Sequence, residues 1–186
     1  MTNWQEIDDV QLIELAKQGE TEAYGEIYQR YVQRIFRFLN AHMNDPKDAE
    51  DLAADVFLSV WRALPDYREQ GTPFLVLLYR VARNRLVDYY RKSGSDWKNL
   101  PIENVVLTDQ HPEPVEVVIK NLEHAELRSY LMRLREDYRT VLVLRYISEL
   151  SPREVAQVMN RSVGAVRVLQ HRAINSLREL IKTAVQ

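Results

Sequence analysis

Residues 151–172 read SPREVAQVMNRSVGAVRVLQHR, and this stretch contains two helix starts separated by a short break. The Ser-Pro-Arg-Glu sequence that begins at Ser151 is the pattern of a capping box with proline at the first helical position. An Asn-Arg pair then interrupts the helix, and Ser162 can cap a second helix over about residues 163–181. Two helices joined by a three-residue turn predict a helix-turn-helix motif.

The second helix of this motif has two unlike sides. At about 100° per residue, one side is apolar, while the opposite side carries three arginines and no acidic residue. Guanidinium groups match guanine edges and phosphates, and the beginning of such a helix enters the major groove, so the helix is predicted to read duplex DNA. The alternative is a solvated face on a helical hairpin. The apolar side comprises Val166, Leu169, Ala173, Leu177 and Leu180, and the other side comprises Gly164, Arg167, Val168, His171, Arg172, Asn175 and Arg178.

Helical periodicity extends over the rest of the chain. A helix over about residues 45–64 begins with Asp-Pro-Lys-Asp and stops at Pro65, and a second helix is expected over residues 73–92. A longer helical period covers residues 122–147. It includes the run Val-Leu-Val-Leu, which short-range periodicity alone does not separate from a strand. We interpret it as helix, because it lies inside that longer helical period.

The composition changes once along the chain, between Ser93 and Val117. Three of the seven prolines fall there, with scattered acidic residues and no apolar period, which predicts a linker. The predicted fold class is therefore all-α: two small helical domains joined by a flexible acidic linker, the second containing the helix-turn-helix. The predicted boundaries are 1–92, 93–116 and 117–186.

Charge is distributed unevenly in a chain whose net charge is only −2. Residues 1–29 carry one basic and seven acidic side chains, whereas residues 120–186 carry twelve basic and seven acidic ones. Such asymmetry favours surfaces that meet polyanions. Random surface variation is the alternative reading of the charge pattern alone.

Several function classes are disfavoured by the composition. The 186 residues include no cysteine, and the four histidines and five glycines are scattered, without metal-ligand or phosphate-loop spacing. We therefore expect no metal, no cofactor and no enzymatic activity. No apolar run approaches the ~18 residues of a membrane helix, so a cytoplasmic protein without membrane contact is expected.

Two helical surfaces in the first half also suggest binding. The helix over residues 73–92 carries bases interleaved with tyrosines, which suits backbone phosphates and stacking on unpaired bases; the alternative is core tyrosines and solvated arginines. The edge of the helix over residues 45–64 is acidic, which suits docking on a basic protein surface, or else is an ordinary solvated face. The first surface comprises Tyr79, Arg80, Arg83, Asn84, Tyr89, Tyr90 and Arg91, and the second comprises Asp48, Asp51, Asp55, Leu58, Ser59 and Arg62.

Together these segments resemble the extracytoplasmic-function (ECF) sigma factors of bacterial RNA polymerase. The resemblance lies in DAEDLAADVFLSVW (48–61), FLVLLYRVARNRLVDYYR (74–91), LSPREVAQVM (150–159) and SVGAVR (162–167), which follow one another in the family's order. It implies a protein that directs core polymerase to specific promoters and initiates transcription. The implied partners are core RNA polymerase, promoter DNA and an anti-sigma factor.

The resemblance also implies a role for each surface. The first domain would dock on the polymerase through Asp48, Asp51, Asp55, Leu58 and Arg62. It would recognise and open the downstream promoter element with Tyr67, Arg68, Tyr79, Arg80, Arg83, Asn84 and Arg91. The second domain would read the upstream element as duplex with Arg145, Arg153, Gly164, Ala165, Arg167, Val168, His171 and Arg172.

The main alternative is a stand-alone helix-turn-helix regulator with an unrelated N-terminal domain. Such a regulator binds intact duplex tightly by itself, at a two-fold-related operator. A sigma factor is expected to bind duplex weakly alone and to open promoters only with core polymerase. A third alternative is an adaptor that binds only other proteins, but this alternative gives the basic face of the last helix no function.

Overall fold

The computed structural model describes residues 3–68, 71–92 and 124–185. These residues form helices and turns without any strand, which confirms the predicted all-α class. The predicted linker over residues 93–116 lies outside them. The α-helices are α1 (Asp9–Lys17), α2 (Thr21–Asn40), α3 (Pro46–Ala63), α4 (Phe74–Lys92), α6 (His124–Arg133), α7 (Glu136–Leu142), α8 (Pro152–Met159) and α9 (Val163–Val185), with a π-helical turn η3 (Val143–Ile147) after α7.

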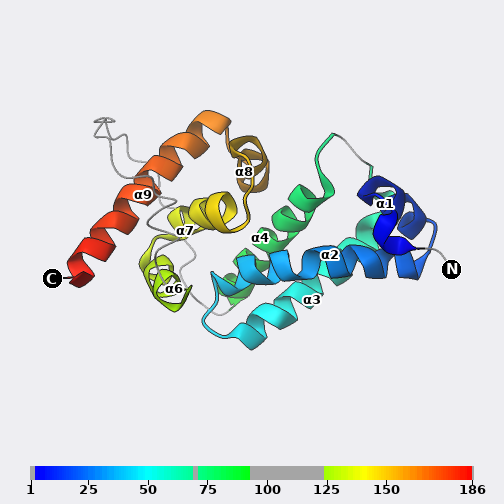
Figure 1. Ribbon diagram of the computed structural model, residues 1–186, viewed down its shortest axis with the longest axis horizontal. Coiled ribbons are helices and arrows are strands. Elements are labelled where there is room, and N and C mark those ends of the chain that lie inside the picture. Colours follow the sequence, from blue (N-terminus) through cyan, green and yellow to red (C-terminus); the bar gives the residue numbers. More distant parts are fainter. Residues whose placement is uncertain (1–2, 69–70, 93–123, 186) are drawn as a thin grey trace.

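The first group of helices, α1 to α4, forms a bundle in which α2, α3 and α4 lie side by side (Figure 1). The predicted start of α3 is confirmed: the Asp45 side chain accepts a hydrogen bond from the Lys47 amide at 2.9 Å, and proline occupies the first helical position. Helices α1 and α2, for which the sequence analysis assigned no boundaries, complete this bundle. Its core includes Ile27, Ile35, Phe38, Val56, Phe57, Leu78, Ala82 and Leu86.

The second group, α6 to α9, differs from the prediction in one respect. The single helical period expected over residues 122–147 is broken between α6 and α7. The buried Arg139 explains the break, because its guanidinium donates hydrogen bonds to the carbonyls of Leu131, Met132 and Leu134 at 2.8 to 3.1 Å. Two of these carbonyls lie in the last turn of α6 and the third belongs to the residue just after it, and a continuing helix would have used all three itself. The Val-Leu-Val-Leu run is helical and buried, as interpreted.

The helix-turn-helix is present with the predicted caps. Ser151 and Glu154 make both bonds of the capping box, and the Ser162 hydroxyl accepts from the Ala165 amide at 3.1 Å. The turn is tight because Asn160 adopts a left-handed conformation, with φ of 53°. Helix α9 continues to Val185, slightly beyond the expected end.

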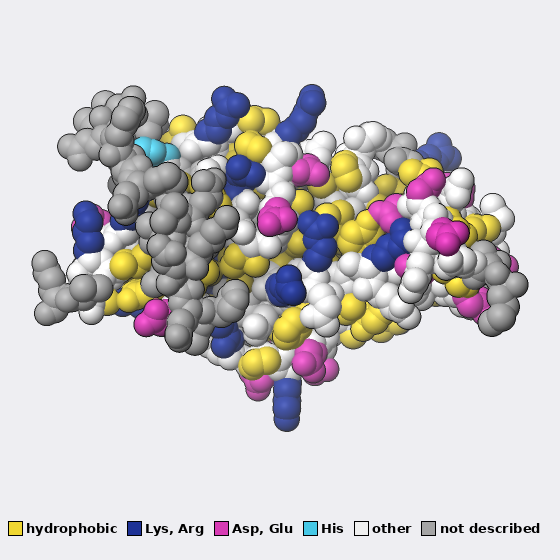
Figure 2. All heavy atoms as spheres, in the orientation of Figure 1, with side chains coloured by type: hydrophobic (Ala, Val, Ile, Leu, Met, Phe, Trp, Pro, Cys, Tyr) yellow, Lys and Arg dark blue, Asp and Glu magenta, His cyan; other side chains and the backbone are white. Residues whose placement is uncertain are grey.

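The two groups of helices pack against each other, with α4 beside α8 and α2 beside η3 (Figure 1). On the face drawn in Figure 2, acidic side chains gather toward the end with the N-terminus, and Lys and Arg side chains spread over the middle of the molecule. None of the described helices combines the length and the apolar character that crossing a bilayer requires.

Candidate nucleic-acid and protein interfaces

Most of the residues expected to read the upstream promoter element lie at the beginning of α9, at the surface of the protein. The buried side chains of Val166, Leu169 and Ala173 seat the helix on α7 and α8. The opposite side of the first three turns is thereby turned outward. Arg153, Gly164 and Arg167 are exposed, and Ala165, Val168, His171 and Arg172 are partly exposed.

The first turn of α9 is open to an approaching ligand. A Cβ atom added at Gly164 would meet only the Ser162 hydroxyl oxygen, at 4.0 Å, so packing inside the protein does not require glycine there. Further along the same face, the side chains of Asn175 and His171 lie within hydrogen-bonding distance, 3.1 Å apart. Exposed arginine beside a bare helix start suits contact with phosphates and base edges.

Arg145 departs from this group. Its guanidinium donates to the carbonyl oxygen of Leu150 and, at 3.3 Å, to the side-chain oxygen of Gln170. It also lies over the ring of Tyr146. Arg145 is thus engaged in joining η3 to the segment before α8 and to α9, while its side chain stays partly exposed, and its contact with the upstream element stays a prediction.

An ion pair that the sequence analysis did not identify fixes the helix-turn-helix. Arg161, in the turn, donates to the carboxylate of Asp137 at 2.6 Å, and Asp137 is 4% exposed. The pair ties the turn to the beginning of α7. In the sequence, Arg161 indicates only the break between two helices. The residues around it give no sign of a partner 24 residues away.

The tyrosines of α4 are structural in this arrangement. Tyr79 is 1% exposed, with its ring edge-on to Phe38 at 5.5 Å, so the expectation that it faces DNA is corrected: it is a core residue. Tyr89 donates to the carboxylate of Asp48 at 2.6 Å, and this bond raises the pKa of Tyr89 to about 12. The hydroxyl of Tyr90 donates to the carbonyl of His42.

The basic residues of the downstream group are more accessible. Arg68, Arg80, Asn84 and Arg91 are exposed, although Arg91 pairs with Asp88 at 2.9 Å. Arg83 is partly buried, and Tyr67 is half-buried with its ring 5.9 Å from that of Phe74. Most of the downstream candidates thus reach the surface, on the outer side of α4 and at Tyr67 and Arg68, and Tyr79 does not.

The predicted docking edge of α3 lies beside an apolar groove. Asp51, Asp55 and Arg62 are exposed, and Leu58 is 50% exposed, which is unusual for a large apolar side chain. The groove has a volume of about 480 Å³ and an almost wholly apolar lining. It is lined by Thr21, Tyr24, Tyr28, Ala54, Phe57, Leu58 and Trp61. An acidic edge beside exposed apolar surface is a combination typical of protein-binding sites. The sequence pattern did not indicate the part of the groove that α2 lines.

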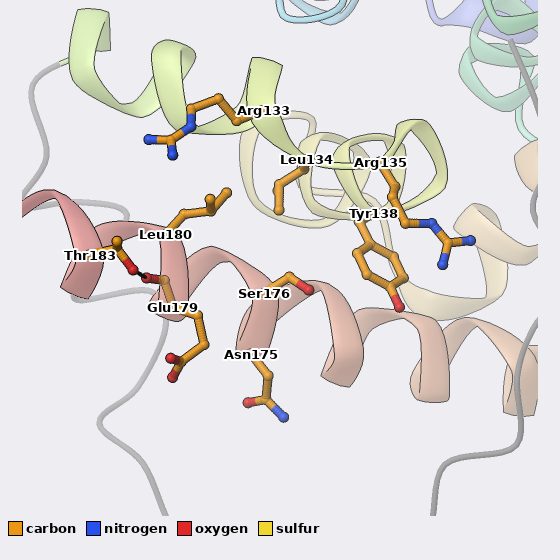
Figure 3. Close-up of a pocket in the computed structure, with 9 residues that line it drawn as sticks. All are labelled: Arg133, Leu134, Arg135, Tyr138, Asn175, Ser176, Glu179, Leu180 and Thr183. Atoms are coloured by element: carbon orange, nitrogen blue, oxygen red, sulfur yellow. Dashed lines mark hydrogen bonds between the residues drawn. The ribbon is translucent and has the colours of Figure 1, made fainter. Parts of the chain in front are cut away.

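A second groove lies between α6, α7 and the far half of α9 (Figure 3). Its volume is about 500 Å³, and its lining combines apolar, cationic and amide side chains. The lining comprises Arg133, Leu134, Arg135, Tyr138, Asn175, Ser176, Glu179, Leu180 and Thr183. It is separate from the exposed start of α9, and none of the eight upstream candidates lines it.

Comparisons with known proteins divide the chain as the fold does. The model of Sigma-70 region 2 matches residues 27–95, and that of Sigma-70, region 4, matches residues 124–177. The first range covers most of α2 and all of α3 and α4, and the second covers α6 to most of α9.

Relatives match over nearly the full chain. The ECF RNA polymerase sigma factor ShbA of Streptomyces griseus is 32% identical over 91% of this chain and 93% of its own. SigD of Mycobacterium tuberculosis, also an ECF RNA polymerase sigma factor, is 31% identical over 89% of this chain and 80% of its own. BldN of Streptomyces coelicolor is 29% identical over 92% of this chain, which spans 65% of that longer relative.

Two solved structures have a fold similar to that of this chain. CnrH, solved in complex with the cytosolic domain of CnrY, has a TM-score of 0.70 at 25% identity, over 92% of this chain and 96% of its own. The sigma factor RpoE of Bartonella quintana, in complex with the anti-sigma factor NepR, shares the fold with a TM-score of 0.66 at 22% identity, over 86% and 96%. With relatives above 30% identity along most of its length and both sigma regions in order, this chain belongs to the extracytoplasmic-function sigma factors of RNA polymerase.

Proposed function

We propose that this sigma factor works through three separate surfaces, one for the polymerase and two for promoter DNA. The observation that carries the proposal is the exposed start of α9, where Arg167 and Gly164 face outward while the inner side of the helix is buried. A helix held in this way presents its first turns to the major groove. The upstream element is read there as duplex, by the exposed and partly exposed residues of α8 and α9.

The downstream element is bound by the polar surface of α4 and the loop before it. Arg68, Arg80, Arg83 and Asn84 hold the backbone of the separated strand, and Tyr67 offers an aromatic face beside them. The proposal excludes Tyr79 because its ring is enclosed by the core.

The polymerase is bound by the acidic edge of α3 together with the apolar groove beside it. Exposed carboxylates at Asp51 and Asp55 select a basic partner, and Leu58 supplies apolar contact. The protein contributes positioning, and the chemistry of transcription belongs to the polymerase, so we propose no catalytic role for this chain. Its place of action is the cytoplasm, where the polymerase works.

Regulation by an anti-sigma factor is part of the proposal. CnrH and the Bartonella quintana RpoE were solved with protein partners, and RpoE's partner is named an anti-sigma factor. A protein of this kind would compete with the polymerase for the exposed surface of the first half.

Arg167→Ala is expected to weaken promoter binding by about 1–3 kcal/mol and to relax the base preference at one position of the upstream element. The side chain is exposed, so the fold is expected to be unaffected. The measurement is holoenzyme binding to a library of upstream elements. Arg178→Ala, further along the same helix, is the matched control. Uniform weakening across all sequences would assign Arg167 to a phosphate instead.

Asp55→Lys is expected to reduce capture of core polymerase by about tenfold or more, because it places a cation opposite a basic partner. Asp55 is exposed and its side chain makes no hydrogen bond in the described structure, so far-UV helicity is expected to stay the same. Glu50→Lys, an exposed change on the same helix, is the control for net charge. Loss of helicity in Asp55→Lys would show that this face is structural.

Run-off transcription with purified core polymerase on a promoter library tests the function as a whole. We expect initiation that depends on this chain, with little duplex binding when the polymerase is left out. Tight binding of the chain alone to intact duplex would favour the stand-alone regulator instead.

A further inference from the structure

Glu149 holds a backbone conformation that residues with a side chain rarely adopt. It lies between η3 and the cap of α8, and its φ is 59°, in the left-handed region. The amides on either side of it close the end of η3. Ser148 donates to the carbonyl of Val143 at 2.8 Å, and Leu150 donates to that of Leu144 at 2.9 Å. A left-handed residue at a helix end is usually glycine, because a Cβ atom is strained there. Glutamate therefore makes this turn less stable than glycine would.

Packing within the fold does not account for the glutamate side chain. Its neighbours Ser148 and Leu150 are buried, at 5% and 2% exposed, whereas Glu149 itself is exposed. Its carboxylate makes no hydrogen bond and no ion pair with any residue that the structure describes. Backbone strain that a fold tolerates tends to occur at functional positions. The carboxylate is therefore a candidate for a function outside the fold.

This carboxylate stands in a strongly basic part of the chain. Residues 143–175 contain five arginines and only two acidic residues, Glu149 and Glu154. Glu154 accepts a hydrogen bond from the Ser151 amide at 2.7 Å, so its charge is engaged in the capping box. Within residues 143–175, which the structure describes in full, Glu149 is thus the one acidic side chain without a partner.

Glu149 also lies beside the residues that are proposed to bind the upstream element. The carbonyl of Leu150, the next residue, accepts from Arg145, and Arg145 in turn donates to the side chain of Gln170 in α9. Arg153 follows in the first turn of α8 and is exposed. A duplex bound along these residues would bring its phosphates close to a free carboxylate.

We propose that Glu149 is a negative determinant of DNA binding: its carboxylate repels the phosphates of duplex DNA and so weakens binding by the free protein. The proposal rests on the function proposed above, because that function places the upstream element on α8 and α9. Repulsion from phosphates does not depend on base sequence, so it acts against the very many non-specific sites of a genome. In the holoenzyme, the contacts made by the polymerase compensate for the loss. A built-in repulsion is one of the two ways in which proteins avoid wrong partners.

Glu149→Gln tests the charge, because it removes the carboxylate and leaves the strained backbone in place. We expect the free chain to bind a short dye-labelled duplex of random sequence about threefold to fivefold more tightly at about 50 mM salt, and the gain to shrink as the salt concentration rises. Glu126→Gln, which removes an exposed acid from α6 of the same half, is the matched control and is expected to show no gain. Equal binding by the two variants would refute the repulsion. Weaker binding by Glu149→Gln would also overturn it, because the carboxylate would then contact DNA favourably.

Glu149→Gly separates the charge from the strain. It removes both, so we expect its urea midpoint to rise, whereas that of Glu149→Gln should equal that of the unchanged protein. Duplex binding is expected to strengthen to the same extent in both variants. Tighter binding by Glu149→Gly alone would refute the proposal, because the gain would then come from the backbone. Failure of the unchanged protein in run-off transcription would instead refute the proposed function, since duplex binding by the free chain is measured without the polymerase.

Discussion

Asp137→Ala is expected to lower the free energy of unfolding by about 3 kcal/mol. The carboxylate is 4% exposed and lies 2.6 Å from Arg161, so the variant leaves a largely buried guanidinium without its counter-ion. Removing one partner of a buried ion pair typically costs about 3–5 kcal/mol. We expect the lower end of that range, because the Arg161 side chain retains 18% exposure and can reach water. Urea denaturation of the full chain measures the change.

Asp88→Ala is the matched control for this prediction. It also breaks an arginine–aspartate pair, with Arg91 at 2.9 Å, but the two side chains are 75% and 42% exposed. Exposed pairs contribute about 0–1 kcal/mol. Equal losses in the two variants would show that burial of Asp137 does not determine its effect, and that the turn of the helix-turn-helix is not fixed by this pair.

The helix starts could be predicted from the sequence because their causes are local. Asp45 and Ser151 each cap the helix that directly follows them, and Ser162 caps α9 through an amide three residues on. The inward and outward sides of α9 also follow from periodicity within one helix. The exposed arginine at position 167 was therefore identified without any tertiary information.

The errors arise where a side chain acts over a long separation in the sequence. Tyr79 stands among arginines in the sequence, a pattern that favours DNA contact, but in the fold its ring packs against Phe38 of α2. Arg139 divides a helical period because its guanidinium donates hydrogen bonds to carbonyls at the end of the preceding helix. The apolar groove beside α3 is lined in part by Tyr24 and Tyr28 of α2. Such contacts depend on how helices pack, which one helix's pattern does not determine.

A series of buried hydrogen bonds joins the first half to α7, and two of the side chains in it have shifted pKa values. His42 lies between the Phe38 carbonyl at 2.7 Å and the Thr140 hydroxyl at 3.0 Å, and Thr140 in turn donates to Glu136 at 2.8 Å. Burial lowers the pKa of His42 to about 3 and raises the pKa of Glu136 to about 7. The charged neighbours that act on these two groups include Arg83 from α4 and Asp137 and Arg139 from α7.

The two shifts act on stability with opposite signs. His42 binds a proton less readily in the folded chain than in the unfolded one, where its pKa is 6.5, so stability falls as the pH falls below about 6.5. Glu136 binds its proton more tightly in the folded chain than at its ordinary pKa of 4.5, so stability rises as the pH falls from about 7 toward 4.5. Each effect is about 1.4 kcal/mol per pH unit within its window. The unchanged protein is therefore expected to have nearly constant stability between pH 6.5 and 5.

Single substitutions are expected to uncover the two opposing effects. In His42→Gln only the glutamate effect is left, so the free energy of unfolding should rise by about 2 kcal/mol as the pH falls from 6.5 to 5. In Glu136→Gln it should fall by about 2 kcal/mol over the same interval. The double variant should again be nearly flat, and His171→Gln, a change outside this series of buried hydrogen bonds, should follow the unchanged protein. Urea denaturation at each pH gives all five curves. Parallel curves for the two single variants would mean that neither group is held in an abnormal protonation state, because opposite slopes follow from the burial of both.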